Sequence, residues 1–313
     1  MAQRIVIALG GNALQSGGAA TAEAQLETVK ETCEYIADIC KAGHNVTLVH
    51  GNGPQVGRIL LATEAAKDVT PAMPFDVCGA MSQGYIGYHL QQSLGYALKK
   101  RGINMPVTSI VTQLVVDEND TGFKNPTKPI GAFYSEAEAK AIEKEHGFTM
   151  KEDSGRGYRR VVASPIPKEI VEIDAIKELI NSAVVSACGG GGVPVVKSRT
   201  GELKGVPAVI DKDFAAELLT ESIDADVFVI LTEVDEVAIN FNTPNQKNLS
   251  KVTYAECEKY CAEGHFAAGS MLPKVQAAMK FVKANPTKKA IIASLAKGKE
   301  AILGESGTTI VFK

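Results

Sequence analysis

The chain has 313 residues, of which 45% are hydrophobic and 22% are charged, a composition that excludes a mainly disordered protein and allows a large buried core. Its formal net charge of -3 excludes the surplus of Lys and Arg that sequence-independent binding to nucleic acid needs. No apolar run reaches the ~20 residues of a membrane helix, and residues 1–7 already resemble a strand, so we expect a cytoplasmic protein that binds neither nucleic acid nor membrane.

Strands and helices alternate in the first half of the chain, which predicts a mainly parallel sheet. The clearest element is a helix over residues 21–41, where apolar side chains recur at three- and four-residue steps and Gly43 follows as a stop signal. The other elements predicted here are strands over 4–9 and 45–49, a helix opening near residue 55, a helix over 81–100 and a long β-rich run over 107–116.

Residues 117–167 interrupt this alternation, because Asn, Pro and Gly crowd around short strand-like pieces such as 158–163. We interpret this stretch as a protruding insert. The alternation then resumes, and a capping-box pattern marks one later helix start at Thr253. The elements predicted after the insert are helices over 173–182 and 214–222, a helix starting at Pro273, and strands over 184–188, 193–196, 206–210, 227–232, 289–293 and 308–312.

Two glycine-rich turns each follow a predicted strand. Turns of this kind expose backbone N–H groups that bind anions, and Pro54 suits the first position of a helix whose amino end favours negative charge. Neither turn has the spacing of a dinucleotide or P-loop motif, and a structural role fits each turn alone equally well. A third glycine run, 189–192, has two possible roles. Its backbone packs against a ligand, or it is a flexible connection between two strands. The two turns contain Gly10, Gly11, Asn12 and Gly51, Asn52, Gly53.

Three lysines stand in contexts that a solvated surface lysine does not need. Lys212 lies between Asp211 and Asp213, where we expect a strand to end. Lys274 lies just inside a predicted helix, and Lys128 lies between two prolines that stiffen the chain. Phosphoryl transfer builds negative charge that the protein must position and neutralise, and ammonium groups with Mg²⁺ suffice for this task. These lysines therefore predict phosphoryl transfer.

Other chemistries have little support in the sequence. It contains no G-x-S-x-G, H-E-x-x-H or C-x-x-C motif, so we predict no metal held by the protein alone and expect the six cysteines to be reduced and structural. His50 closes a strand and is more often a packed residue there than a general base. The segment 232–237 mixes apolar and polar groups as the edge of a nucleoside site would, although a solvated turn explains it equally well.

Several segments together resemble the carbamate kinases, a family of the amino acid kinase superfamily. The likeness runs from Ile5 to Phe312. The NPTKP segment is its most specific part, because other amino acid kinases lack the lid that carries it. The segments are LGGNAL at 9–14, HGNGPQVG at 50–57, NPTKPIG at 125–131, YRRVV at 158–162, ACGGGG at 187–192, VIDKD at 209–213 and GSMLPK at 269–274.

This resemblance implies a three-layer αβα sandwich with a central, mainly parallel sheet of about eight strands. It implies one domain over residues 1–313, a lid subdomain over 117–167 and a homodimer. The implied reaction is reversible: carbamoyl phosphate and ADP give ATP and carbamate, which decomposes to ammonia and CO₂. Mg²⁺ would accompany the nucleotide, and the reaction would serve arginine catabolism.

The resemblance also implies roles for individual residues. Lys212 and Lys274 would hold the phosphoryl group in transfer, Asp213 would orient them, and Lys128 would close over carbamoyl phosphate from the lid. The substrate would be cradled by Gly10, Gly11, Asn12, Gly51, Asn52 and Gly53, and the nucleotide would contact Asp211, Thr232, Asp235, Val237, Met271, Pro273 and Lys274.

Two alternatives remain open. The chain could be an acylphosphate-forming kinase that acts on an amino-acid carboxylate such as acetylglutamate. It could instead be an inactive metabolite sensor that keeps the nucleotide cleft. Turnover assays with carbamate and with acetylglutamate distinguish the first alternative from a carbamate kinase. Nucleotide binding without turnover favours the second alternative.

Overall fold

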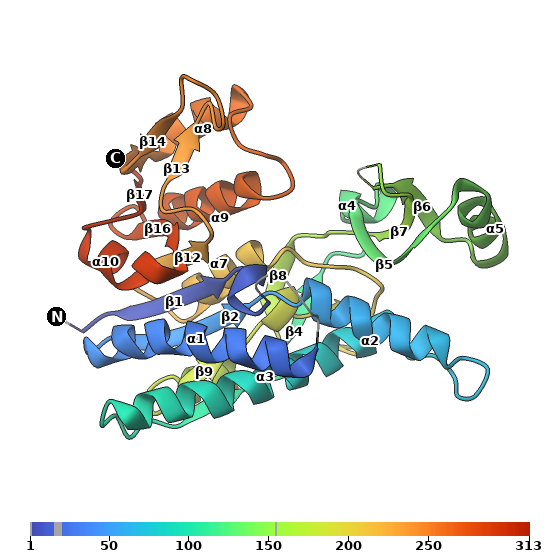
Figure 1. The fold of residues 1–313 in the computed structure, drawn as a ribbon, viewed down its shortest axis with the longest axis horizontal. Helices are drawn as coiled ribbons and strands as arrows, with labels where there is room; N and C mark the ends of the chain where they lie inside the picture. Colours follow the sequence, from blue (N-terminus) through green and yellow to red (C-terminus); the bar gives the residue numbers. More distant parts are fainter. Residues whose placement is uncertain (1, 16–20, 154) are drawn as a thin grey trace.

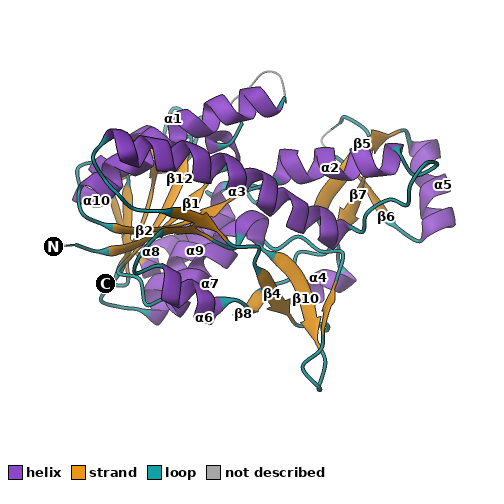
Figure 2. Cartoon of the chain, turned by 90° about the horizontal axis from the view of Figure 1, so that it is seen from below, coloured by secondary structure: helices purple, strands orange, loops and turns teal. Residues whose placement is uncertain are grey.

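The computed structural model describes residues 2–15, 21–153 and 155–313, which form a three-layer αβα sandwich with a protruding lobe (Figures 1 and 2). The central sheet has eight strands, and all of its neighbours pair in parallel except β16 and β17. The predicted fold class is therefore confirmed. The strand order is β15 (Lys251–Thr253), β17 (Thr308–Val311), β16 (Lys289–Ser294), β12 (Val227–Thr232), β1 (Arg4–Leu9), β2 (Asn45–His50), β9 (Val184–Ser186) and β3 (Val107–Ser109).

The inner strands are covered on both faces, so successive side chains of one strand enter two different cores. In β1, Ile5 and Ile7 belong to one core, and Val6 and Ala8 belong to the other; all four are fully buried. The first core includes residues of α1 (Ala22–Lys41), α3 (Phe75–Lys100) and α10 (Gly298–Leu303). The second core includes residues of α6 (Ile173–Leu179), α7 (Lys212–Ser222), α8 (Tyr254–Ala262) and α9 (Met271–Ala284).

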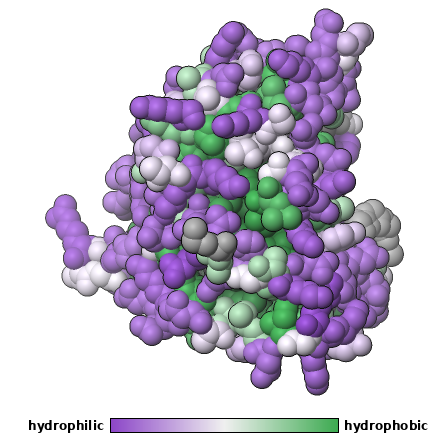
Figure 3. Space-filling model, turned by 90° about the vertical axis from the view of Figure 1, so that its left-hand side faces the viewer, coloured by the Kyte–Doolittle hydropathy of each residue, from purple (hydrophilic) through white to green (hydrophobic). Residues whose placement is uncertain are grey.

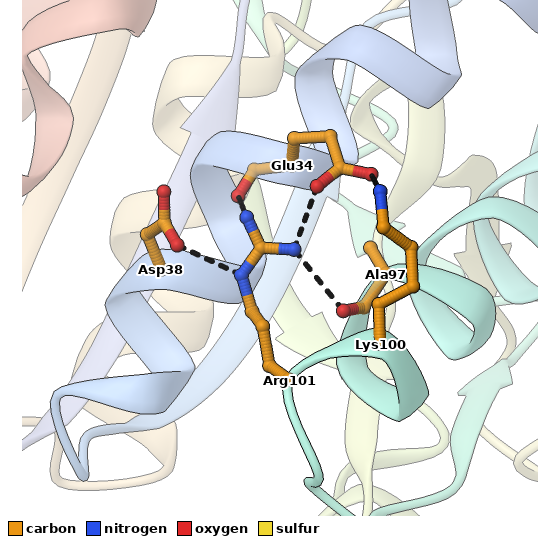
Figure 4. A network of polar contacts seen from close by, with 5 residues as sticks. All are labelled: Glu34, Asp38, Ala97, Lys100 and Arg101. Carbon is orange, nitrogen blue, oxygen red and sulfur yellow. Dashed lines mark hydrogen bonds and ion pairs between the residues drawn. The ribbon is translucent and has the colours of Figure 1, made fainter.

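Arg101 fastens the C-terminal end of α3 to α1 (Figure 4). Its guanidinium donates hydrogen bonds to the carboxylate of Asp38 at 2.8 Å and to the carboxylate and carbonyl of Glu34 at 2.6 and 3.1 Å. Lys100 adds an ion pair to Glu34 at 2.9 Å. These hydrogen bonds lower the pKa of both carboxyl groups, so the network between the two helices is charged at neutral pH.

The protruding lobe lies within residues 117–167 and stands at the right of Figure 1. Its antiparallel sheet has the order β5-β7-β6. The elements of the lobe are α4 (Thr121–Lys124), β5 (Lys128–Tyr134), α5 (Glu136–His146), β6 (Thr149–Glu152) and β7 (Tyr158–Val162). Next to it lies a small sheet of β11 (Leu203–Gly205), β10 (Val193–Lys197), β4 (Gln113–Val116) and β8 (Pro167–Ile170), while α2 (Gly53–Ala65) packs against β5. A hairpin of β13 (Val237–Ile239) and β14 (Lys247–Leu249) completes the strands.

Two strand predictions were wrong. Residues 206–210 do not form a strand: within them only Ala208 makes an isolated bridge, to Ala163. Ala208 and Ile210 are 3% and 1% exposed, so this apolar run is explained by packing rather than by strand pairing. The β-rich run 107–116 is divided between β3 and β4, which belong to different sheets.

Helix boundaries also differ from the predictions. The helix predicted over 81–100 begins at Phe75, and the one predicted to start at Pro273 begins at Met271, with the proline still inside its first turn, where a missing N–H is tolerated. Helices α5 and α10 were not predicted. The capping box predicted at Thr253 is confirmed, since its side chain accepts a hydrogen bond from Glu256 and the Glu256 carboxylate accepts one in return.

Figure 3 views the side of the molecule that lies at the left of Figure 1, away from the lobe. Hydrophilic side chains cover most of this face, and apolar residues form a band between them. In α3, Tyr88 and Tyr96 expose 60% and 67% of their surface. Among the described helices, none combines the length and the apolar character that a bilayer crossing requires.

Candidate active site

The charged residues of the site gather at the N-terminus of α7. Asp211 is the N-cap residue, and its Oδ1 accepts the backbone N–H of Asp213 at 3.0 Å. A helix N-terminus favours negative charge, which suits both carboxylates. Lys212 is therefore the first residue of a helix and not, as predicted, the residue after a strand.

Asp213 holds two ammonium groups. Its Oδ1 lies 2.5 Å from Nζ of Lys212, and its Oδ2 lies 2.9 Å from Nζ of Lys274, which α9 supplies. The three side chains are 3%, 13% and 14% exposed. Burial opposes the charged form of Asp213, but the two ammonium groups outweigh burial and lower its pKa. Burial also lowers the pKa of Lys212, and Asp213 counteracts that shift.

The third predicted lysine reaches the same helix end from the lobe. Lys128, the first residue of β5, places Nζ 3.1 Å from Oδ2 of Asp211. Two carboxylates that are two residues apart thus hold lysines 128, 212 and 274, which come from three separate segments of the chain. Asp211, to which the resemblance assigns a nucleotide contact, pairs in this structure with the lysine of the lobe.

The first glycine turn lies beside the buried lysines. A cavity of about 520 Å³ is lined by Gly10, Gly11 and Asn12 together with Lys212 and Lys274. Gly10 follows β1 directly, and a Cβ there would approach the Leu231 carbonyl oxygen to 3.2 Å, so the turn is close against β12. The other residues that line the 520 Å³ cavity include Leu231, Thr232, Glu233, Ser270 and Ser294.

The second glycine turn opens mainly on a smaller cavity of about 220 Å³. Asn52 and Gly53 line this cavity with Lys128 and with Arg159 of β7. Gly51 lies instead beside Lys212, since a Cβ there would be 3.6 Å from its Cδ. The two glycine turns therefore serve two cavities, one beside the buried lysines and one beside the lobe. Arg159 was not predicted, although it belongs to the YRRVV segment.

The tetraglycine run packs against the second turn. A Cβ on Gly189 would lie 2.3 Å from Nε2 of His50, and one on Gly190, whose φ is +67°, would lie 2.1 Å from Nδ2 of Asn52. His50 is 1% exposed and its Nδ1 donates to the Gly51 carbonyl at 2.8 Å. Burial lowers its pKa to about 4, so His50 is a neutral packed residue and not a base facing the cavity.

A third cavity, of about 560 Å³, adjoins the first, because Thr232, Glu233, Ser270 and Lys274 line both. Met271 also lines it, as do Phe241 and Phe266, which the sequence analysis did not single out. Four residues predicted to contact the nucleotide are not among its lining residues, one of them being Asp211, which pairs with Lys128. Val237 is 1% exposed in the core and donates its N–H to Thr308, Asp235 accepts a hydrogen bond from Ser294, and Pro273 lies in the first turn of α9.

Comparison with known proteins identifies the family. A model described as the amino acid kinase family matches residues 3–294. A carbamate kinase of Clostridium perfringens is 58% identical to the chain, over 98% of this chain and 99% of its own length. The chain belongs to the carbamate kinase family. A second relative, the carbamate kinase of Pyrococcus horikoshii, is 52% identical over 99% of each chain.

A solved structure of the same family has the same fold. The carbamate kinase of Giardia lamblia bound to AMP-PNP matches with a TM-score of 0.95 and 42% sequence identity, covering 100% of this chain and 99% of that chain. The predicted resemblance to the carbamate kinases is confirmed. Members of this family are kinases that phosphorylate a carboxyl-type acceptor, and the prediction of such an enzyme is confirmed with it.

Proposed function

We propose that this carbamate kinase family member transfers the phosphoryl group of carbamoyl phosphate to ADP, reversibly, and releases carbamate that decomposes to ammonia and CO₂. The observation that carries the proposal is the buried Asp213, which holds Lys212 and Lys274 beside the first glycine turn. Two ammonium groups fixed in a cavity beside a glycine turn suit a transferring phosphoryl group.

The transfer is direct and in line. The bond between phosphorus and the carbamate oxygen breaks while a bond to an oxygen of the ADP β-phosphate forms, and the lysines neutralise the equatorial oxygens. The residues that line the 520 Å³ cavity include neither His nor Cys. His50, the histidine considered as a base in the sequence analysis, is buried with a lowered pKa. This arrangement supports transfer without a phosphoenzyme.

We further propose that residues 117–167 act as a lid subdomain within one domain spanning 1–313. Lys128 would close over carbamoyl phosphate, exchanging its contact with Asp211 for one with the substrate. Of the six residues predicted to cradle the substrate, Gly11, Asn12, Asn52 and Gly53 would supply backbone or amide donors. The N–H groups of Gly10 and Gly51 donate to the Leu231 and Leu9 carbonyls, so these two glycines would only allow the substrate to approach the backbone.

The nucleotide would occupy the 560 Å³ cavity and extend into the 520 Å³ cavity, because the two share Lys274. Thr232 and Met271 would flank the adenosine. Among the described residues, no cluster of three or more His, Cys, Asp or Glu is arranged to hold a metal. Mg²⁺ prefers phosphate oxygens and water with few carboxylates, so it would arrive as part of the nucleotide substrate.

A homodimer and a role in arginine catabolism stay proposals that rest on the family. The exposed Tyr88 and Tyr96 of α3 offer apolar surface that a second copy could cover. Sedimentation equilibrium tests the assembly, and a mass near 33.1 kDa at all concentrations would contradict it.

The deciding experiment is a coupled assay of ATP formation from carbamoyl phosphate and ADP, with and without Mg²⁺. We expect ATP formation from carbamoyl phosphate to require Mg²⁺. We expect no ATP formation when acetylglutamyl phosphate replaces carbamoyl phosphate. Nucleotide binding without any turnover would favour the sensor alternative. Incubation with ³²P-carbamoyl phosphate in the absence of ADP tests the direct transfer, since labelled protein would contradict it.

A further inference from the structure

Arg159 is a second cation of the lobe, and it lines the same 220 Å³ cavity as Lys128. It lies on β7, which pairs with β5, the strand that begins at Lys128. The cavity also contains Asn52 and Gly53 of the second glycine turn. The function proposed above gives Arg159 no role.

The guanidinium of Arg159 is fixed by the lobe itself. Nη1 donates to Asp153 at 3.1 Å, Nη2 donates to the Gly131 carbonyl at 3.1 Å, and Cζ lies 5.0 Å from the ring centroid of Phe133. The side chain is 20% exposed. A guanidinium held on one side in this way is preorganised to bind a ligand with its remaining donors.

One of those remaining donors is buried without a partner. Nε of Arg159 has no hydrogen-bond acceptor among the described residues. A buried N–H without an acceptor costs ~1–3 kcal/mol, which a bound acceptor would recover. Guanidinium donors bind carboxylate and carbonyl oxygens with defined geometry. The unpaired Nε therefore points to a ligand that brings an oxygen acceptor.

A carboxylate lines the same cavity. Asp76 lies in the first turn of α3 and is half-buried. A cavity that contains one guanidinium and one carboxylate complements a group with both an oxygen acceptor and an N–H donor. The carbamoyl group, with its carbonyl oxygen and its amino group, is of this kind.

The neighbouring arginine has a different environment. Arg160 stacks on Phe148, with Cζ 3.6 Å from the ring centroid, and lines a separate cavity with Glu64 of α2. Successive residues of a strand point to opposite faces, so only Arg159 shares the cavity of Lys128. Arg160 is thus a matched control of the same type, on the same strand.

We propose that Arg159 and Asp76 recognise the carbamoyl group of the substrate. Arg159 binds the carbonyl oxygen of carbamoyl phosphate, or the non-reacting oxygen of carbamate in the reverse reaction, and Asp76 accepts a hydrogen bond from the amino group. This inference rests on the proposed function. The cavity volume, about 220 Å³ against about 520 and 560 Å³ for the other two, fits the smaller of the two substrates.

The test compares Arg159→Gln, Arg159→Lys and Arg160→Gln in the assay of ATP formation. We expect Arg159→Gln to raise KM for carbamoyl phosphate ~10-fold or more, to leave KM for ADP within ~2-fold, and to be partly restored in Arg159→Lys. Arg160→Gln should leave both KM values within ~2-fold. An Arg159→Gln enzyme with the KM for carbamoyl phosphate of the wild type would overturn the inference.

The variant Asp153→Asn distinguishes a purely structural role of Arg159 from a contact with substrate. It weakens the hydrogen bond that Asp153 accepts from Arg159 but keeps the guanidinium. We expect this variant to leave KM for carbamoyl phosphate within ~3-fold. An increase as large as that of Arg159→Gln, or a parallel rise in KM for ADP, would assign Arg159 to the architecture of the lobe and overturn its contact with substrate.

Asp76 is tested by selectivity. Acetyl phosphate has the carbonyl oxygen but no amino group, so Asp76→Asn should raise KM for carbamoyl phosphate several-fold and leave the inhibition constant of acetyl phosphate unchanged. Arg159→Gln should weaken both. Equal effects of Asp76→Asn on the two compounds would overturn its assignment. A wild-type chain that forms no ATP would defeat the proposed function itself, whereas an active wild type with unaffected variants defeats only this inference.

Discussion

The sandwich side and the lobe side of the site hold their lysines differently. On the sandwich side, Lys212 and Lys274 are 13% and 14% exposed and share Asp213, which is 3% exposed. On the lobe side, Lys128 is 33% exposed and Asp211 is 17% exposed. Charges attract more strongly where water is excluded, and pairs open to solvent exchange partners at little cost.

Under the proposed function, this difference would separate two tasks. The buried trio is fixed before substrate arrives, as stabilisation of a developing charge requires. The lobe pair is more exposed, so under the proposed function a substrate oxygen would replace the contact with Asp211, as binding and release require. Substitutions on the sandwich side should therefore reduce kcat, and those on the lobe side should mainly raise KM for carbamoyl phosphate.

The largest expected effect comes from Lys212→Ala. Loss of one donor to a developing charge in a buried site costs ~3 kcal/mol or more, so kcat should fall by at least ~100-fold. Initial rates of ATP formation at saturating substrates measure it. The matched control is Lys280→Ala. Lys280 also pairs with a carboxylate of α7, that of Glu217, but neither residue lines the 520 Å³ cavity. A near-normal kcat in Lys212→Ala would contradict the claim that the sandwich side of the site controls kcat.

Lys128→Ala should have a smaller and different effect. Removing the lobe cation weakens the contact with carbamoyl phosphate, so its KM should rise ~10-fold while kcat changes less than ~5-fold. Separate titrations of carbamoyl phosphate and ADP measure the two KM values. If only the KM for ADP moved, the lobe lysine would belong to the nucleotide and the comparison would fail.

Glu217 sharpens the comparison within α7 itself. Asp213 pairs with two ammonium groups and has a lowered pKa. Glu217 pairs with Lys280, which is 44% exposed, and burial raises the pKa of Glu217 to about 7. Because the pKa of Glu217 is higher in the folded state than its ordinary value of 4.5, protonated Glu217 stabilises the fold. This contribution of Glu217 to the free energy of unfolding is complete below about pH 4.5 and is lost as the pH rises through about 7.

Glu217→Gln should therefore remove a pH dependence of stability. The shift corresponds to about 3 kcal/mol at most, so the variant should gain a few degrees in Tm relative to the wild type at pH 8 and little or nothing at pH 5. Calorimetry at both pH values measures this difference. Lys280→Ala should instead lower Tm at pH 8, because it leaves the Glu217 carboxylate without its cation. An equal gain at both pH values would assign the effect to packing.

The sequence predicted the elements that local pattern controls and missed those that distant contacts control. The alternating strands, the helix over 21–41 and the cap at Thr253 follow from periodicity and capping. Helix α5 also has a capping box, at Ser135 and Glu138, but the Gly- and Pro-rich neighbourhood obscured it. Residues 206–210 have the composition of a buried strand, and only the folded chain decides that this run packs without pairing.

The same distinction applies to the site. Lys212 and Lys274 stand out locally, by flanking carboxylates and by a helix start. The pair of Lys128 with Asp211 joins residues 83 positions apart, and no local signal specifies it. Arg159 and Arg160 are indistinguishable in the sequence, because the register of β7 alone decides which of them enters the cavity of Lys128.

The smallest expected effect compares two buried cysteines. Cys78 is fully buried in a small cluster formed by α2, α3 and the lobe strands, and Cys188 is fully buried in the core of the sandwich. Burial raises the pKa of both thiols, so both should react slowly with iodoacetamide at pH 7.5. Ile130 and Val162 of the lobe belong to the same cluster as Cys78, so we expect movement of the lobe to expose Cys78 without unfolding the sandwich.

We therefore expect Cys78 to be alkylated several-fold faster than Cys188, and carbamoyl phosphate to slow only Cys78. Mass spectrometry of each cysteine peptide over time measures both rates. Alkylation after denaturation in guanidinium, where both thiols should react alike, is the control for intrinsic reactivity. Equal rates in the native protein would mean that the lobe is held as firmly as the core. The partly exposed Lys128–Asp211 pair would then be a fixed contact.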